Sequence, residues 1–265
     1  MKRFTPDWLI YGTIVLLIYL NATRAARHDF PHPPPPEELG ELLPGESPRD
    51  PTVLVDIDAP TSGVGTAFAI DSDGNWLTAR HVVDGCDNVG LKIGAERGMR
   101  LEKDISKDSD AALLKSTWKR QPIPIDATSQ RQMGEYGFFF GFPQGKPGEA
   151  IGSLIGRHRL MVRGRYNTEE AVLAWTELGR TKGLNGSLGG LSGGPVLDKD
   201  GEVIGIIAAE SPRRGRIYTV APKNLREYTP DETVIAEPID AQRYGTYADR
   251  YRRDRRIAQV ICLVK

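Results

Sequence analysis

Short apolar runs alternate with clusters of turn residues along the chain from residue 52 onward. Runs such as "GTAFAI", "EYGFFFGF" and "EVIGIIAA" have the length and composition of strands, with few long helical periods between them. Residues 68–79 ("FAIDSDGNWLTA") and 195–206 ("PVLDKDGEVIGI") share a pattern, in which an apolar run enters Asp-x-Asp-Gly and a second apolar run leaves it. Each is expected to form a tight hairpin. The pattern predicts an all-β protein with two related halves.

The two Asp-x-Asp-Gly turns also match the beginning of a calcium-binding loop. Such a loop needs a bidentate glutamate at its twelfth position, and those positions are occupied by Val82 and Ala209. We therefore interpret both segments as turns, and we predict no metal site and no cofactor.

The first 51 residues follow a different pattern. Lys2 and Arg3 precede the apolar residues 8–20, "WLIYGTIVLLIYL", which have the length of the core of an export signal. We predict a signal peptide or a signal anchor over residues 1–26, and we favour the uncleaved anchor because no clean Ala-x-Ala site follows. Residues 27–51 are rich in proline and acidic side chains and are expected to form a flexible linker. This organisation places the body of the protein outside the cytoplasm, in the periplasm or at the cell surface, attached to a membrane.

Composition and charge restrict the partners of the chain. Lysine plus arginine and aspartate plus glutamate number 35 each, so no net charge directs the chain toward nucleic acid. The basic residues 250–256, "RYRRDRR", are interpreted as a solvated face. The two cysteines, Cys86 and Cys262, do not have metal-ligand spacing and form either one disulfide or two separate buried thiols. We favour the disulfide, because the apolar C-terminal run "VICLV" needs an anchor and an oxidising compartment permits one.

Three residues carry the candidate chemistry. His81 ends an apolar strand in "WLTARHVVDG", and Ser192 lies between two glycine pairs in "GGLSGGPV". Asp110 precedes the apolar strand in "SKDSDAALLKS", where an unpaired charge would be costly. Asp108 competes with it for the role of the acid, and His158, which lies between arginines, is interpreted as a surface residue.

These residue types suit nucleophilic catalysis. A serine hydroxyl becomes nucleophilic when an imidazole takes its proton and a carboxylate holds that imidazole in the correct tautomer. A glycine-rich turn lets the amides of Gly190 and Ser192 converge on one point, as an oxyanion hole requires. The letters "GLSGG" also fit the nucleophile elbow of α/β-hydrolases, but that fold needs a later histidine, and none follows Ser192. The α/β-hydrolase interpretation is therefore excluded.

With these motifs, the chain resembles the chymotrypsin-fold (trypsin-like) serine peptidases and is most similar to the bacterial HtrA-type protease domain. The resemblance rests on "TARH", "SDAALLK" and "GGLSGGPV", which follow the order His, Asp, Ser at intervals of 29 and 82 residues. It implies two antiparallel six-stranded β-barrels with the active site in the cleft between them, preceded by the N-terminal hydrophobic helix and the proline-rich tether. The protease domain would span residues 52–225, and residues 226–265 would form a tail packed on the barrel.

The resemblance implies a role for each candidate. His81 would act as general base and then general acid, Asp110 would orient it, and Ser192 would be the nucleophile. The N–H groups of Gly190 and Ser192 would form the oxyanion hole. The substrate-binding residues that it implies are Ala208, Ala209 and Glu210, on a strand that pairs with an extended peptide, and Arg216 near the primary pocket. We expect Arg216 to face outward and leave a small apolar pocket, because a buried unpaired guanidinium is costly.

Three features depart from the family pattern. Leu191 stands where digestive members have aspartate and HtrA-type members usually have asparagine, so activation by an ion pair with a freed N-terminus is not expected. About 40 residues follow the barrel, too few for the PDZ domain of HtrA proteins, and none is expected. Gly186, six residues before the serine, leaves the preferred side chain at the cleaved bond open.

The function that follows is a serine endopeptidase that hydrolyses peptide bonds of extracytoplasmic proteins through an acyl-enzyme. The alternative is a catalytically inactive, protease-like binding or scaffold module. A complete set of triad residues flanked by glycines favours the enzyme, while Leu191 leaves the resting form of the oxyanion loop open.

Overall fold

The computed structural model describes residues 11–16, 39–94 and 98–265. The chain separates into two units, Met1–His32 and Pro33–Lys265. In the first unit residues 11–16 are helical, and the rest of the predicted signal segment lies outside the described ranges. None of the helices within the described ranges has the length and apolar character that crossing a membrane requires.

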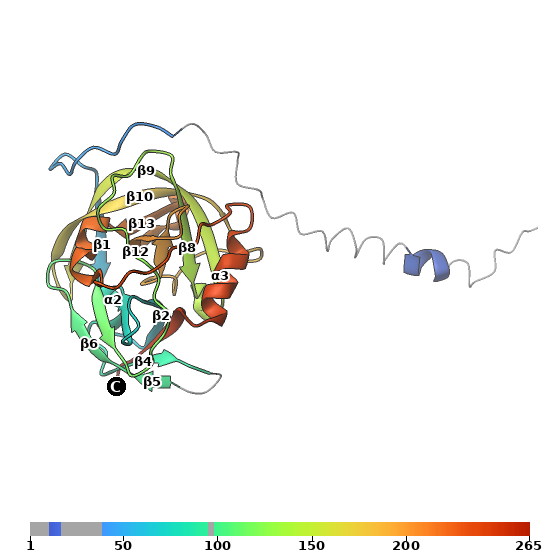
Figure 1. The fold of residues 1–265 in the computed structure, drawn as a ribbon, viewed down its shortest axis with the longest axis horizontal. Coiled ribbons are helices and arrows are strands. Elements are labelled where there is room, and N and C mark those ends of the chain that lie inside the picture. Colours follow the sequence, from blue (N-terminus) through green and yellow to red (C-terminus); the bar gives the residue numbers. More distant parts are fainter. Residues whose placement is uncertain (1–10, 17–38, 95–97) are drawn as a thin grey trace, which may run out of the picture. The chain divides into compact units, whose positions relative to one another are not determined.

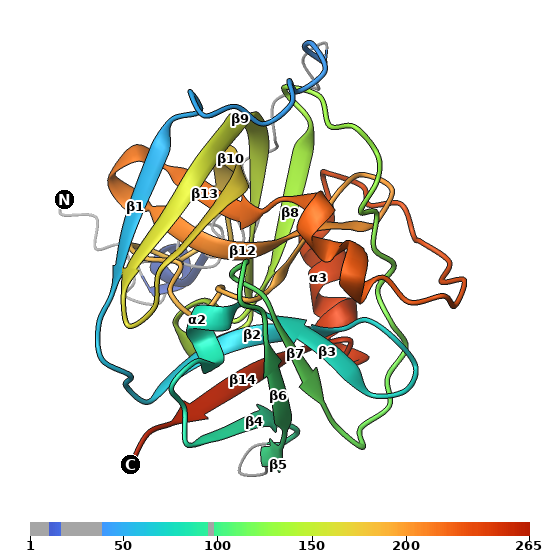
Figure 2. The same ribbon diagram turned by 90° about the vertical axis from the view of Figure 1, so that its left-hand side faces the viewer.

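The second unit is built on two seven-stranded sheets (Figures 1 and 2). The first sheet has the strand order β5-β4-β14-β2-β3-β7-β6, and the helix α2 (Arg80–Val83) directly follows β3. Its strands are β2 (Gly63–Ala69), β3 (Asn75–Thr78), β4 (Asn88–Lys92), β5 (Gly98–Arg100), β6 (Glu102–Ile105), β7 (Ala112–Lys115) and β14 (Ile257–Leu263).

The second sheet has the order β1-β9-β10-β13-β12-β11-β8, and an additional pairing of β8 with β9 closes six of these strands into a ring. Its strands are β1 (Thr52–Ile57), β8 (Tyr136–Gly141), β9 (Gly148–Gly164), β10 (Thr168–Arg180), β11 (Pro195–Leu197), β12 (Val203–Ser211) and β13 (Arg216–Val220). The remaining helices are η1 (Pro143–Gly145), η2 (Pro212–Arg214), η3 (Pro222–Tyr228) and α3 (Tyr244–Arg253).

The strand content confirms the prediction of a mostly β fold, but each sheet has seven strands where six were predicted. In the second sheet, β1 joins the closed ring through parallel pairing with β9. In the first sheet, β14 pairs with β2 on one edge and with β4 on the other. Residues 226–265 were predicted to be a tail packed on the barrel. Their apolar run around Cys262 instead forms this inner strand, because it pairs with β2 on one side and with β4 on the other.

Both predicted hairpins are confirmed: β2 pairs antiparallel with β3, and β11 pairs antiparallel with β12. Asp71 Oδ1 accepts hydrogen bonds from the backbone N–H groups two and four residues later, at 2.9 and 3.0 Å. Asp198 Oδ1 does the same in the second hairpin, at 3.0 and 3.1 Å. The glycines of the two turns have positive φ, 99° at Gly74 and 83° at Gly201, which is why glycine ends each Asp-x-Asp-Gly motif.

Part of the predicted linker belongs to the folded unit. The N–H of Gly40 donates to the carbonyl of Met133 at 2.8 Å, and the N–H of Leu43 donates to the carbonyl of Arg131 at 2.7 Å. Further along, the carbonyl of Pro51 accepts the N–H of Arg159 on β9 at 2.9 Å, so residues 40–51 of the predicted linker are hydrogen-bonded to the folded unit at both ends. Residues 27–38 lie outside the described ranges.

The basic run lies at the end of α3 and in the turn after it, and its prediction as a solvated face was wrong for two residues. Arg252 is 8% exposed and pairs with the buried Glu149 at 2.7 Å. Arg256 is also buried, with its guanidinium 4.6 Å from the ring centre of Tyr251. These arginines are buried because α3 packs on β8, where aromatic side chains of the helix meet aromatic side chains of the strand.

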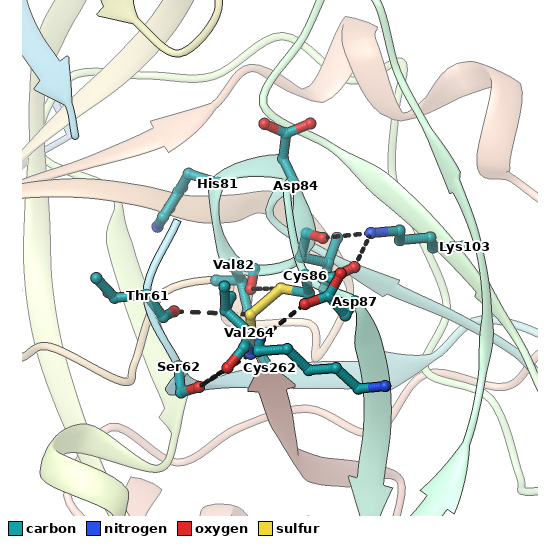
Figure 3. The surroundings of a disulfide bond; sticks show 12 residues. Thr61, Ser62, His81, Val82, Asp84, Cys86, Asp87, Lys103, Cys262 and Val264 are labelled. Atoms are coloured by element: carbon teal, nitrogen blue, oxygen red, sulfur yellow. Dashed lines mark hydrogen bonds between the residues drawn. A yellow bond between two sulfur atoms is a disulfide. The ribbon is translucent and has the colours of Figure 1, made fainter. Parts of the chain in front are cut away.

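A disulfide joins the end of β14 to the turn after α2 (Figure 3). Cys86 and Cys262 are 176 residues apart in sequence and each is 5% exposed. The ammonium group of Lys103 donates to the carbonyls of Val83 and Cys86, at 3.0 and 2.7 Å, and so holds the same turn from β6. The disulfide thus ties the last strand of the first sheet to the segment that begins with His81.

Replacing both cysteines by serine is expected to lower the free energy of unfolding by about 2–4 kcal/mol, because the closed loop restricts the unfolded chain. Urea unfolding monitored by circular dichroism measures this change, and reduction of the wild type should give the same loss. Mass spectrometry of an unreduced tryptic digest should find Cys86 and Cys262 in one linked peptide pair. Free thiols at both positions would contradict the disulfide.

Candidate functional site

A single carboxylate holds His81 at two points. Nδ1 of His81 lies 2.8 Å from Oδ2 of Asp110, and the backbone N–H of His81 donates to Oδ1 at 2.9 Å. The imidazole comes from α2, and the carboxylate comes from the residues just before β7. Because the carboxylate accepts at Nδ1, the ring carries its proton there and presents Nε2 as a proton acceptor.

The structure brings Asp110 to the imidazole, and it does not bring Asp108 there. Asp110 is only 2% exposed, whereas Asp108 is exposed on the loop that precedes it. A buried carboxylate needs hydrogen-bond donors, and His81 supplies two of them. His158, the other histidine of the folded unit, is half-buried on β9 and packs against Tyr218.

Two opposing effects act on the imidazole. Burial lowers the pKa of His81, and the guanidinium of Arg165 lowers it further. The negative charge of Asp110 and its hydrogen bond outweigh both, so the pKa of His81 is raised above the ordinary value of 6.5. Arg165 itself is neutralised by Asp84, at 2.7 Å.

A second buried carboxylate, which sequence reasoning missed, supports Asp110. Oε1 of Glu170 accepts the backbone N–H of Asp110 at 2.6 Å, and Oε2 accepts from the side-chain amide of Asn224 at 2.9 Å. Burial and the charge on Asp110 raise the pKa of Glu170 to about 7. No local signal in "NTEEAVLAW" distinguishes this glutamate from its neighbour Glu169, because its partners lie on distant segments.

The turn that carries Ser192 is held by hydrogen bonds to consecutive carbonyls. The carbonyl of Gly189 accepts the N–H of Gln144 at 2.5 Å, and the carbonyl of Leu191 accepts the N–H of Gly194 at 2.9 Å. The carbonyl of Gly190 accepts the hydroxyl of Thr66 at 2.8 Å. Further along, the carbonyl of Ser192 accepts the backbone N–H of Thr66 at 2.9 Å.

This arrangement fixes the two predicted oxyanion donors. A trans peptide points its C=O and N–H in opposite directions, so bonds to the carbonyls of Gly189 and Leu191 also orient the N–H groups of Gly190 and Ser192. Within the described ranges, neither of these two N–H groups has a hydrogen-bond partner. Both are therefore free to donate to a ligand.

The nucleophile and the base belong to different sheets. Ser192 precedes β11 in the second sheet, and His81 follows β3 in the first. Ser192 is half-buried, and in the part of the chain that the structure describes no hydrogen bond joins its hydroxyl to His81. In unliganded enzymes this hydrogen bond is often long and shortens only when substrate binds.

Leu191 explains how the turn is anchored without the acidic residue of digestive relatives. The side chain is 1% exposed and belongs to an apolar cluster of the second sheet that includes Trp175, Leu188 and Ile207. Burying a leucine side chain stabilises the folded state by about 1.5–3 kcal/mol, so packing of Leu191 anchors this turn in place of an ion pair. The departure from the family pattern is thus accommodated in the core.

A cleft of about 390 Å³ opens between the two sheets beside His81. It is lined by His81 and Val82 of α2 and by Ala208, Ala209 and Glu210 of β12, and Ser192 is not among its lining residues. β12 pairs with β13 along one edge, and its pairing with β11 ends at Ile206, so among the described residues no strand pairs with the other edge at Ala208–Glu210. A free edge of this kind can accept an extended peptide as an added strand.

Glu210 and Arg216 have different surroundings. The backbone N–H of Leu188 donates to both carboxylate oxygens of Glu210, with N···O distances of 2.9 Å, and the hydroxyl of Ser187 donates to one of them. The guanidinium of Arg216 instead donates to the hydroxyl of Thr176 on β10. The carboxylate of Glu210 therefore spans from β12 to the segment after Gly186, the expected wall of the primary pocket.

One acidic cluster has the composition of a metal site. The carboxylates of Asp126, Asp198 and Glu202 lie within 4.8 Å of one another. The guanidinium of Arg131 is 2.6 Å from Asp126 and 3.1 Å from Asp198. Arg131 supplies the positive charge that a cation would bring, so the cluster is a structural ion-pair network.

Comparison with known proteins agrees with this geometry. The trypsin-like peptidase domain family matches residues 65–206, which include all three candidate triad residues. A Synechocystis relative named serine protease HhoB is 31% identical over 157 residues, 57% of this chain and 36% of its own length. A DegP-like periplasmic serine endoprotease of Pseudomonas savastanoi is 28% identical over 158 residues, 58% of this chain and 31% of its own length. The chain thus spans about a third of these curated relatives.

Among solved structures, the active form of the Rv3671c protease from M. tuberculosis superposes with a TM-score of 0.51 at 16% identity, covering 76% of this chain and 98% of that one. This likeness shows the fold. The chain belongs to the trypsin-like peptidase domain family, and its curated relatives are HtrA/DegP proteins.

Asp110→Asn is expected to keep the fold and to lower kcat by up to about ten-thousandfold, because an amide holds the imidazole in the wrong tautomer. Only neutral His81 can accept the serine proton, and its pKa is raised, so activity of the wild type should fall with decreasing pH through a midpoint above 6.5. Removing the charge of Asp110 should move this midpoint to lower pH. The profile of kcat/KM against pH measures both effects.

Asp108→Asn is the matched control, since Asp108 is exposed and does not contact His81. It should leave kcat and the pH profile unchanged. A large loss in the Asp108 variant with none in the Asp110 variant would show that the other carboxylate orients the base.

Proposed function

We propose that this chain is a serine endopeptidase that cleaves extracytoplasmic proteins through an acyl-enzyme. The observation that carries the proposal is the pairing of the imidazole of His81 with the buried Asp110, together with two N–H groups on the glycine-rich turn of Ser192 that have no partner among the described residues. His81 takes the proton of Ser192 as the hydroxyl attacks the peptide carbonyl, and the N–H groups of Gly190 and Ser192 stabilise the oxyanion. The imidazolium then protonates the leaving amine. In the second half of the reaction, His81 takes a proton from water as the water attacks the acyl group, and it returns that proton to the oxygen of Ser192.

The substrate class follows from the cleft. The free edge of β12 at Ala208–Glu210 supports binding of an extended peptide, because main-chain hydrogen bonds do not depend on side-chain identity. An extracytoplasmic location is supported by the periplasmic assignment in the name of the Pseudomonas relative and by the Cys86–Cys262 disulfide.

One observation favours a second candidate, a protease-like binding module without turnover. No hydrogen bond joins Ser192 to His81 within the described ranges, and a module that only binds peptides would not need one. The two candidates differ in the reactivity of a single hydroxyl, which can be measured directly.

A fluorophosphonate probe is expected to label Ser192 in the wild-type protein and not in Ser192→Ala, because only a hydroxyl beside an imidazole and oxyanion donors reacts quickly. Intact-protein mass spectrometry after timed exposure measures the labelling. His81→Ala should slow the labelling without unfolding the protein. Equal modification of the wild type and the Ser192→Ala variant would identify the chain as a binding module.

For specificity, we infer that the primary pocket accepts only small side chains. The carboxylate of Glu210 reaches across to Ser187 and Leu188, and so occupies space that a larger side chain would need. The guanidinium of Arg216 donates to the hydroxyl of Thr176 on β10, and Arg216 is not among the residues that line the cleft beside His81.

Glu210→Gly is therefore expected to shift the preference at the cleaved bond from small residues to larger apolar residues by at least about tenfold in kcat/KM, in line with the value of a few buried methylenes. Cleavage of a peptide library with mass-spectrometric readout measures the profile. Glu210→Gln keeps the size of the side chain and should keep the preference for small residues. A wild-type profile dominated by glutamate, aspartate, lysine or arginine would show that charge, not size, sets the specificity.

A further inference from the structure

Thr66 of β2 connects the first sheet to the turn of Ser192 by two hydrogen bonds, and to Phe142 by a third. Its backbone N–H donates to the carbonyl of Ser192 at 2.9 Å, and its hydroxyl donates to the carbonyl of Gly190 at 2.8 Å. The same hydroxyl oxygen accepts the N–H of Phe142 at 3.1 Å. The Thr66 residue is 0% exposed, so no water competes for these bonds.

The hydroxyl acts on the part of the turn that has the most conformational freedom. Gly189 and Gly190 have no side chains, and Gly190 has a φ of +94°, so no side chain of either residue fixes the peptide between them. The N–H of Gln144 donates to the carbonyl of Gly189, and the hydroxyl of Thr66 donates to the carbonyl of Gly190. The N–H of Gly190 shares its peptide with the carbonyl of Gly189, so the bond from Gln144 sets its direction. The bond from Thr66 and the bond from the N–H of Leu191 to the carbonyl of Leu188, at 2.8 Å, hold the next peptide and so restrict rotation about Gly190.

The same hydroxyl also connects the two segments that hold Gly190. Phe142 directly precedes η1, and Gln144, whose N–H holds the carbonyl of Gly189, lies within η1. A Cβ at Gly141 would lie 2.5 Å from the Thr66 hydroxyl oxygen, so this segment and Thr66 are in close contact. Loss of the hydroxyl would therefore remove the bond to the carbonyl of Gly190 and the bond from the N–H of Phe142, which directly precedes η1.

We propose that Thr66 is a positioning residue for catalysis: its hydroxyl keeps the N–H of Gly190 directed at the oxyanion of the substrate. The inference rests on the proposed peptidase function. Thr66 does not contact the substrate, and it acts through the peptides of Gly190. The expected consequence is a selective loss of transition-state stabilisation with little change in binding of the substrate ground state.

Thr66→Val tests this, because valine has the shape of threonine and lacks the hydroxyl. Direct loss of one oxyanion donor lowers kcat by about 10²–10³, so misdirecting one should lower kcat by about tenfold to a hundredfold with KM unchanged. Affinity for a peptidyl boronic acid, whose tetrahedral adduct places an oxygen at the oxyanion position, should fall by the same factor as kcat/KM. Thr66→Ser retains the hydroxyl and should restore both values to within about threefold of the wild type.

Thr219→Val is the matched structural control. Thr219 is also 0% exposed, and its hydroxyl accepts from the indole of Trp175 at 3.0 Å, within the second sheet. This variant should lose thermal stability to a similar degree and keep the kcat and boronic acid affinity of the wild type. If Thr66→Val does not fold, Thr66→Ala removes the hydroxyl without adding bulk and allows the same comparison.

The outcomes separate the inference from the proposed function. A wild type that hydrolyses peptides, with a folded Thr66→Val variant whose kcat is within about twofold, would overturn the role of Thr66 and leave the peptidase assignment intact. Equal losses in Thr66→Val, Thr66→Ser and Thr219→Val would also overturn it, because destabilisation alone would then explain them. A wild type that neither hydrolyses peptides nor reacts with fluorophosphonate would remove the proposed function itself.

Discussion

The candidate site depends on the hydrogen bonds between β2 and the turn of Ser192. The imidazole and its carboxylate belong to the first sheet, while the serine and its amides belong to the second, so the geometry of the site is the geometry of the contact between sheets. Backbone and side chain of Thr66 hold two alternate carbonyls of this turn, those of Gly190 and Ser192. The N–H of Gly193 adds a bond to the carbonyl of Ile207 at 2.8 Å, within the second sheet. The turn is thus fixed from both sides.

The buried carboxylate of Asp110 is likewise held in place by hydrogen bonds from other segments of the chain. A carboxylate that is 2% exposed is stable only when donors surround it, and two of these come from His81. Glu170 is buried beside it and accepts the N–H of Asp110, which adds a second acidic group close to the first. Burial and the charge of Asp110 raise the pKa of Glu170 to about 7, so this second carboxyl stays protonated to a higher pH than an ordinary glutamate does. The repulsion between the two groups is reduced accordingly at acidic pH.

The residues that sequence reasoning could identify are those whose role is encoded by near neighbours. The hairpins of Asp71 and Asp198, the histidine after "TA" and the serine between glycine pairs each have a local pattern that chemistry can interpret. The choice of Asp110 over Asp108 was also accessible, because Asp110 directly precedes an apolar strand.

The residues that it could not identify act across long separations. Thr66 and Gly190 are 124 residues apart, and Glu170 and Asp110 are 60 apart, so no local pattern links them. The same reason explains why β14 was treated as a tail, since its apolar run was visible and its partners were not. Arg252 and Arg256 looked solvated because a run of charges does not show that aromatic rings and Glu149 bury part of it.

The position of β14 also determines at which point of synthesis the first sheet can be completed. Chains leave the ribosome from the N-terminus, and domains generally fold as they emerge. Here Ile257 pairs with Phe68 and Cys262 with Val89, so the sheet that carries His81 lacks an inner strand until residue 263 has been made. The second sheet needs no residue beyond Val220 to form all its pairings. The nascent chain can therefore order the turn of Ser192 before the sheet of His81 is complete, and both halves of the candidate site cannot reach their final form until residue 263 has been made.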